Sequence, residues 1–135
     1  MLDLLKDKNN LIALIGASND KNKYGNKILL DLISKGHNVV PINPEEDSIA
    51  GLKSYSNVSE LSEKPSIINF VIPPNIGFQL TKGLVESDYD NFWYQPGAES
   101  EEISAFLDEK NKSFIDDKCI MVEAKRWLIP WIFKF

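Results

Sequence analysis

Gly16, Ala17 and Ser18 are the residues whose types and position could bind an anion. They directly follow the apolar run 11–15 and precede the amphipathic segment 27–35, an order that predicts a buried strand, a loop and a helix. Because glycine has no Cβ, a ligand can approach the backbone N–H groups of such a loop, and the following helix directs its positive dipole end toward the same place. The pattern therefore predicts a site for a phosphate or a similar anion.

The charges around this loop favour an anionic ligand, but the spacing of the glycines does not show which ligand it is. In a chain of net charge −5, the loop carries three basic residues and one acidic residue: Lys21, Lys23, Lys27 and Asp20. The next glycine is Gly25, nine residues after Gly16, so the G-x-G-x-x-G fingerprint of dinucleotide-binding enzymes is absent. On these residues alone, a tightly packed strand-turn-helix without a ligand remains an alternative.

The elements that must position these residues alternate between strand and helix. Strand patterns occur at 11–15, 39–44, 66–72 and 92–95, with a last edge-strand region at 113–115 and 120–122. Helical patterns occur at 1–10, at 27–35, from about residue 75 with Ile76, Leu80 and Leu84 on one face, and at 99–108. This alternation predicts an α/β fold with a Rossmann-like, doubly wound, mainly parallel sheet of about five strands and helices on both faces.

Four strand ends of this sheet combine turn residues with hydrogen-bonding groups. They are Gly16-Ala17-Ser18, Asn43-Pro44, Pro73-Pro74 and Gln95-Pro96-Gly97. Ligands of open α/β sheets bind at the carboxyl ends of the strands, where the strand order reverses. We therefore expect these four segments to meet at one edge of the sheet and to surround one site, although structural turns use the same residue types.

The strand ends carry a resemblance to a known family. The segments GAS…YGNKIL, VVPINP, INFVIPPN, WYQPGAESEE and CIMVE resemble the small single-domain CoA-binding proteins of bacteria, often called YccU-like. Their domain is similar to the CoA-binding domain of the succinyl-CoA synthetase α subunit. The resemblance covers residues 5–127, and its most specific parts are QPGAESEE and CIMVE.

The resemblance implies a protein that binds CoA or an acyl-CoA through its nucleotide diphosphate at the carboxyl edge of the sheet. It implies the following contacts: Gly16, Ala17 and Ser18 at the phosphate-binding turn; Lys23, Tyr24 and Gly25 beside the nucleotide; Asn43 and Pro44 along the adenosine; Pro73 on the opposite wall; Gln95 and Gly97 at the far rim. It assigns no catalytic residue and no metal ligand. Complete ligase activity is not expected, because this chain has no room for the histidine-bearing domain and second subunit of the synthetase.

The sequence departs from the family pattern after the second predicted strand. Many relatives carry a lysine after Asn-Pro, whereas Pro44 is followed here by Glu45-Glu46-Asp47, three acids that would repel a phosphate. One alternative is therefore an NAD(P)-type nucleotide-binding module, in which an acid after the second strand binds a ribose. Glu45 lies 29 residues beyond Gly16, however, and the usual spacing is about 20.

The second alternative is a regulatory or interaction protein with a vestigial pocket. The apolar tail 127–135, WLIPWIFKF, supports this reading because it could form a homodimer or partner surface. The only histidine, His37, is expected at a surface turn, and the only cysteine, Cys119, is expected as a small buried residue.

Composition limits the class of protein. The 135 residues are 43% hydrophobic, which suits a single domain over 1–135 with a packed core. The acidic balance argues against nucleic-acid binding. The sequence contains neither a membrane-length apolar stretch nor a signal-peptide pattern, and one cysteine suits a reducing compartment. We therefore expect a cytoplasmic protein that binds no membrane.

Overall fold

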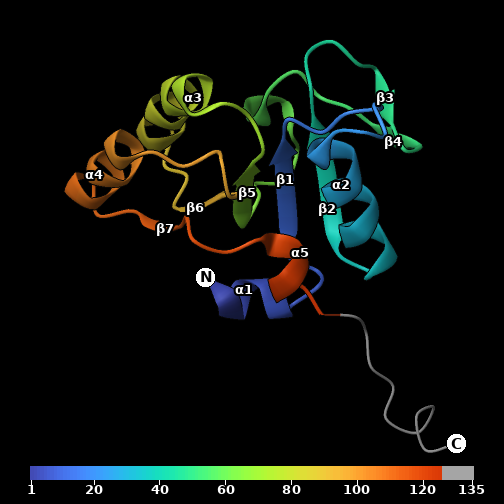
Figure 1. The fold of residues 1–135 in the computed structure, drawn as a ribbon, viewed down its shortest axis with the longest axis horizontal. Helices are drawn as coiled ribbons and strands as arrows, with labels where there is room; N and C mark the ends of the chain where they lie inside the picture. The colour runs from blue at the N-terminus through green and yellow to red at the C-terminus, as the bar shows by residue number, and fades with distance from the viewer. Residues whose placement is uncertain (126–135) are drawn as a thin grey trace, which may run out of the picture.

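Five strands form a parallel sheet in the order β2-β1-β5-β6-β7 (Figure 1). The computed structural model describes residues 1–125, and the strands of this sheet are β1 (Leu11–Ile15), β2 (Asn38–Ile42), β5 (Ile67–Phe70), β6 (Asn91–Tyr94) and β7 (Ser113–Ile115). A separate antiparallel hairpin consists of β3 (Ser48–Ile49) and β4 (Leu52–Lys53). The strand order and the parallel pairing confirm the Rossmann-like α/β fold that the sequence predicts.

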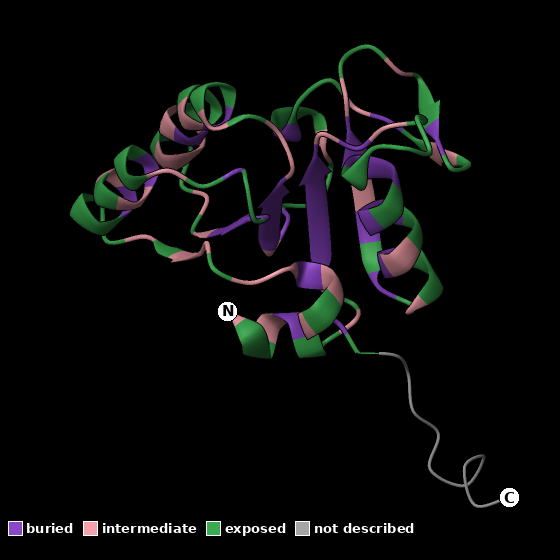
Figure 2. Ribbon diagram, viewed as in Figure 1, coloured by how far each residue is buried: buried purple, intermediate pink, exposed green. Residues whose placement is uncertain are grey.

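Helices cover both faces of the sheet. They are α1 (Leu2–Lys6), α2 (Tyr24–Ser34), α3 (Pro74–Glu86), α4 (Glu101–Glu109) and α5 (Ile120–Glu123), with one turn of 3-10 helix, η1 (Val58–Glu60). Ile12 and Leu14 of β1 pack in one apolar cluster with α2 and α5, whereas Ala13 and Ile15 pack in a second cluster with α3 and α4. Side chains of a strand alternate between faces, so β1 is buried along its whole length (Figure 2).

The helices begin where the sequence supplies suitable residues. The Oγ of Ser100 accepts a hydrogen bond from the N–H of Ile103 at 3.2 Å and so caps α4. Helix α3 begins with Pro74, which has no N–H and loses nothing at the first helical position. Helix α2 begins at Tyr24, three residues before the amphipathic segment expected from the sequence, so that Gly25 belongs to its first turn.

Two expectations about local structure are wrong. Residues 120–122 belong to helix α5 and not to an edge strand, because the N–H of Ala124 bonds the carbonyl of Ile120 at 2.8 Å and Ile120 is fully buried in the cluster beneath α2. Periodicity cannot separate strand from helix in so short an apolar run. His37 is 8% exposed and not a surface residue, because the chain turns back under α2, where the His37 N–H donates to the carbonyl of Leu32.

The predicted apolar tail, 127–135, lies outside the described residues. The expectation of a dimer or partner surface there stays a prediction.

Candidate functional site

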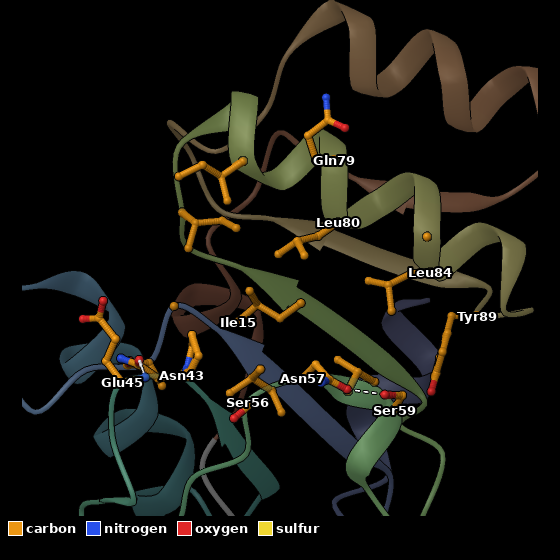
Figure 3. A pocket seen from close by; sticks show the side chains of 18 of the residues that line it. Ile15, Asn43, Glu45, Ser56, Asn57, Ser59, Gln79, Leu80, Leu84 and Tyr89 are labelled. Carbon is orange, nitrogen blue, oxygen red and sulfur yellow. Dashed lines mark hydrogen bonds between the residues drawn. The ribbon is translucent and has the colours of Figure 1, made fainter.

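A cavity of about 840 Å³ opens at the carboxyl ends of β1 and β2 and continues between α3 and η1 (Figure 3). Asn43 and Glu45 lie at one end of it, and Leu84 and Tyr89 lie at the other. The strand order reverses here, because the chain passes from β1 to β2 on one side of the sheet and from β5 to β6 and β7 on the other. Such a switch point is where open α/β sheets bind ligands.

Two glycines determine the shape of the turn after β1. Gly16 has a φ of +99°, and a Cβ there would lie 2.7 Å from the carbonyl oxygen of Val71 and from the Cγ2 of Ile72. A Cβ on Gly25 would lie 2.0 Å from the carbonyl oxygen of Gly16. Both positions therefore require glycine, and the first turn of α2 packs directly against the backbone of the turn.

Several backbone N–H groups of this turn have no hydrogen-bond partner among the residues that the structure describes. Within residues 1–125, no acceptor pairs with the N–H of Ala17, Ser18 or Asn19, nor with those of Tyr24 and Gly25 in the first turn of α2. Unpaired N–H groups at a loop and at a helix start attract anions, and the dipole of the helix adds to the effect. The geometry of the turn therefore suits a phosphate group.

Asn43 fixes the end of β2 against this turn. Its Nδ2 donates to the carbonyl of Ala17 at 2.9 Å, its backbone N–H donates to the carbonyl of Tyr55 at 2.9 Å, and its Oδ1 accepts the N–H of Glu45 at 2.9 Å. Both polar atoms of the side chain thus have a partner within the protein. Asn43 therefore positions Pro44 and Glu45 on the cavity.

The part of the cavity beneath α3 is apolar. Ile76 and Leu80 of α3 line it and are 50% and 41% exposed, although both are large apolar side chains. Helix α3 instead contacts the sheet through the buried Gly77 and Thr81, and the Thr81 Oγ1 lies 2.6 Å from the Tyr94 hydroxyl. The sequence predicts the apolar face of this helix, but only the structure shows that it borders a cavity.

Six of the eleven residues predicted to contact the ligand line this cavity: Gly16, Ala17, Ser18, Lys23, Asn43 and Pro44. The other five do not: Tyr24, Gly25, Pro73, Gln95 and Gly97. Tyr24 is 65% exposed, with the Lys27 Nζ 5.3 Å from its ring centroid. Pro73 and Gly97 are exposed at the ends of β5 and β6.

Gln95 has a structural role that the sequence does not reveal. Its side chain is 4% exposed, its Oε1 accepts the N–H of Ile120 at 2.9 Å, and its Nε2 donates to the Sγ of Cys119 at 3.2 Å. Cys119 is half-buried. These bonds connect the end of β6 to the start of α5, a contact between segments 25 residues apart in the chain.

Two charged side chains line the cavity, Lys23 and Glu45. Both lie at its polar end, near the turn, and the apolar part beneath α3 carries no charge. The neighbouring Glu46 accepts a hydrogen bond from the Asn19 Nδ2 at 3.0 Å and does not line the cavity. A bound phosphate would therefore meet one ammonium group and one carboxylate.

In the part of the chain that the structure describes, no three histidine, cysteine or acidic side chains gather into a possible metal site. Among those same residues, no helix combines the length and the apolar character that crossing a bilayer requires.

Comparisons with known proteins agree with the geometry. A family model described as "CoA binding domain" matches residues 10–125. A solved structure of a conserved hypothetical protein from Pyrococcus furiosus is 50% identical, with a TM-score of 0.81, and the match covers 84% of this chain and 98% of that one. The uncharacterized protein YneT of Bacillus subtilis is 28% identical over 111 residues, which are 82% of each chain.

A longer relative matches over part of the chain. The α subunit of ADP-forming acetate–CoA ligase II from Pyrococcus furiosus is 36% identical over 63 residues, 46% of this chain. The match spans only 14% of the length of that subunit.

Proposed function

The chain belongs to the CoA-binding domain family, and from this premise we propose that it binds CoA or an acyl-CoA with the diphosphate at the turn 16–18. The observation that carries this proposal is the pair of unpaired N–H groups at Ala17 and Ser18, two residues that line the cavity at the switch point of the sheet, with the unpaired N–H of Asn19 next to them in the chain. The Lys23 ammonium group lines the same cavity and would offset part of the negative charge of the diphosphate.

The adenosine would occupy the cavity between the end of β2 and helix α3. Asn43 and Pro44 would form one wall, and Ile76 and Leu80 would form the other with apolar surface that suits a flat aromatic base. The rest of the cofactor would leave the cavity along Pro73 and Gly97. Gly25 would contribute its backbone N–H, and Gln95 would act indirectly by fixing the end of β6.

We assign no reaction to the protein. Two charged side chains line the cavity, Lys23 and Glu45, and both lie on the nucleotide side of the proposed ligand. Within residues 1–125, neither is bonded to a second side chain with which it could act as an acid–base pair. A binding protein without its own catalytic residues is the function that the site supports best.

Titration of the full chain with CoA, acetyl-CoA, NAD and NADP tests the proposal. A ligand at a hundred times its dissociation constant stabilises the folded protein by roughly 2.7 kcal/mol, which a thermal unfolding scan detects. We expect CoA or acetyl-CoA to raise the melting temperature. Stabilisation by NAD alone would show that the alternative, an NAD-type module, is correct.

A matched pair of lysine variants tests the position of the diphosphate. Lys23 lines the cavity and Lys21 does not, although both are exposed in the same loop. Lys23→Gln should weaken CoA binding by roughly fivefold, since one exposed charge contact is removed, whereas Lys21→Gln should change it little. Equal effects of the two variants in calorimetric titrations would contradict the proposed position.

A further inference from the structure

We propose that Glu45 makes the site prefer a nucleotide whose ribose carries free hydroxyl groups over one whose ribose carries a 3′-phosphate. The site thus binds dephospho-CoA more tightly than CoA. This inference rests on the proposed nucleotide site and defines its ligand more closely.

The end of β2 lies beside the turn that binds the diphosphate. The N–H of Gly16 donates to the carbonyl of Ile42 at 3.2 Å, and the Nδ2 of Asn43 donates to the carbonyl of Ala17 at 2.9 Å. A ribose joined to a phosphate at the turn therefore faces the residues that follow β2. Glu45 is one of these residues, and it lines the same cavity (Figure 3).

The carboxylate of Glu45 can recognise a ribose only through its hydroxyl groups. An ionised carboxylate has acceptors and no donors, so it accepts hydrogen bonds from the 2′- and 3′-hydroxyls. An acid after the second strand has this role in dinucleotide-binding folds. A 3′-phosphate removes one of these donors and adds negative charge, which the carboxylate repels.

The charge of Glu45 is available to the ligand. Its backbone is fixed by the bond from its N–H to the Asn43 Oδ1, and no lysine in residues 1–125 lies within ion-pair distance of its carboxylate. Lys53 lies in the adjacent hairpin, but its Nζ is 4.9 Å from the centroid of the Tyr55 ring. Glu46, by contrast, is bonded to Asn19.

The long spacing between Gly16 and Glu45 does not weaken this assignment. The usual interval of about 20 residues is exceeded because the loop 16–23 separates β1 from the start of α2 at Tyr24. The strand pairing of β1 with β2 nevertheless returns the chain to the cavity. The distance along the chain is thus longer, while Glu45 still lies on the cavity at the end of β2.

Calorimetric titration of the full chain with CoA and with dephospho-CoA tests the preference at low ionic strength. In the unmodified protein we expect dephospho-CoA to bind about three- to tenfold more tightly, an effect limited by the exposure of Glu45. Glu45→Gln keeps the shape of the side chain, removes its charge and should bring the two affinities close together. Asp47→Asn removes a charge from the same segment at a position that does not line the cavity, and it should leave most of the preference intact.

The outcomes separate the two levels of the proposal. Equal affinities in the unmodified protein, tighter binding of CoA, or an unchanged preference in Glu45→Gln overturns the role of Glu45 and leaves the nucleotide site in place. Failure of both compounds to bind overturns the nucleotide site and this inference with it. A preference that is lost in Glu45→Gln and kept in Asp47→Asn supports the proposal.

Discussion

Substitution of Gly25 by alanine tests how closely α2 packs against the turn. The added Cβ would lie 2.0 Å from the Gly16 carbonyl oxygen, whereas real Cβ atoms essentially never come closer than 3.0 Å to another heavy atom. The helix start or the turn must therefore move by roughly 1 Å, because the neighbouring atom belongs to rigid backbone. Overpacking of this kind typically costs about 1–3 kcal/mol, which exceeds the helix-propensity gain of alanine, at most about 1 kcal/mol.

We expect Gly25→Ala to lower the free energy of unfolding by about 1–2 kcal/mol and to weaken CoA binding strongly, since it displaces the N–H groups that we propose to bind the diphosphate. Urea unfolding followed by circular dichroism measures the first effect, and calorimetric titration measures the second.

Gly83→Ala is the matched control for stability. Gly83 lies inside α3, and a Cβ there meets nothing within 4 Å. The same substitution should therefore stabilise the protein by about 0.5–1 kcal/mol. If Gly25→Ala were as stable as the unmodified protein and bound CoA equally well, the close packing of α2 against the turn would be refuted.

Two further predictions concern buried polar groups outside the site. Burial, together with the nearby charges of Lys8 and Lys35, lowers the pKa of His37, so the unfolded chain takes up a proton at a higher pH than the folded one. When the pH falls from about 7.5 to below the unfolded pKa of about 6.5, the unmodified protein should therefore lose more stability than the His37→Gln variant. Urea unfolding at each pH measures both losses, and equal losses would contradict this prediction. Asn69 is fully buried, and its Oδ1 and Nδ2 have no hydrogen-bond partner within residues 1–125. Replacement by leucine, which has a similar shape, should therefore raise the free energy of unfolding by about 1–3 kcal/mol. A loss of stability in Asn69→Leu would instead reveal a polar partner.

The sequence predicts those elements that are determined by residue types close together in the chain. The five apolar residues of β1, the glycine turn and the helix after it follow from residue types and short spacings alone. The alternation of strands and helices then implies that the ends of β1 and β2 meet. For this reason the predicted contacts at 16–18 and at Asn43 do lie together.

The features that the sequence does not predict depend on contacts between distant segments. The Gln95 side chain bonds the backbone of Ile120, and no local pattern indicates this pairing. The apolar face of α3 carries the helical period of a core helix, yet Ile76 and Leu80 border a cavity because Gly77 and Thr81 make the contact with the sheet. The sequence places the acids 45–47 together beside the ligand, and only the structure shows that Glu45 lines the cavity while Glu46 and Asp47 do not.

The central claim is that backbone N–H groups of the turn bind the diphosphate of a CoA-type nucleotide. Backbone amide chemical shifts, followed by NMR while CoA is added to the isotopically labelled full chain, test it most directly. We predict that the largest changes fall on Ala17, Ser18 and Asn19, with smaller changes along Ile76 and Leu80. Saturable binding that leaves the amides of 17–19 unchanged, or no change at any residue, would contradict the claim.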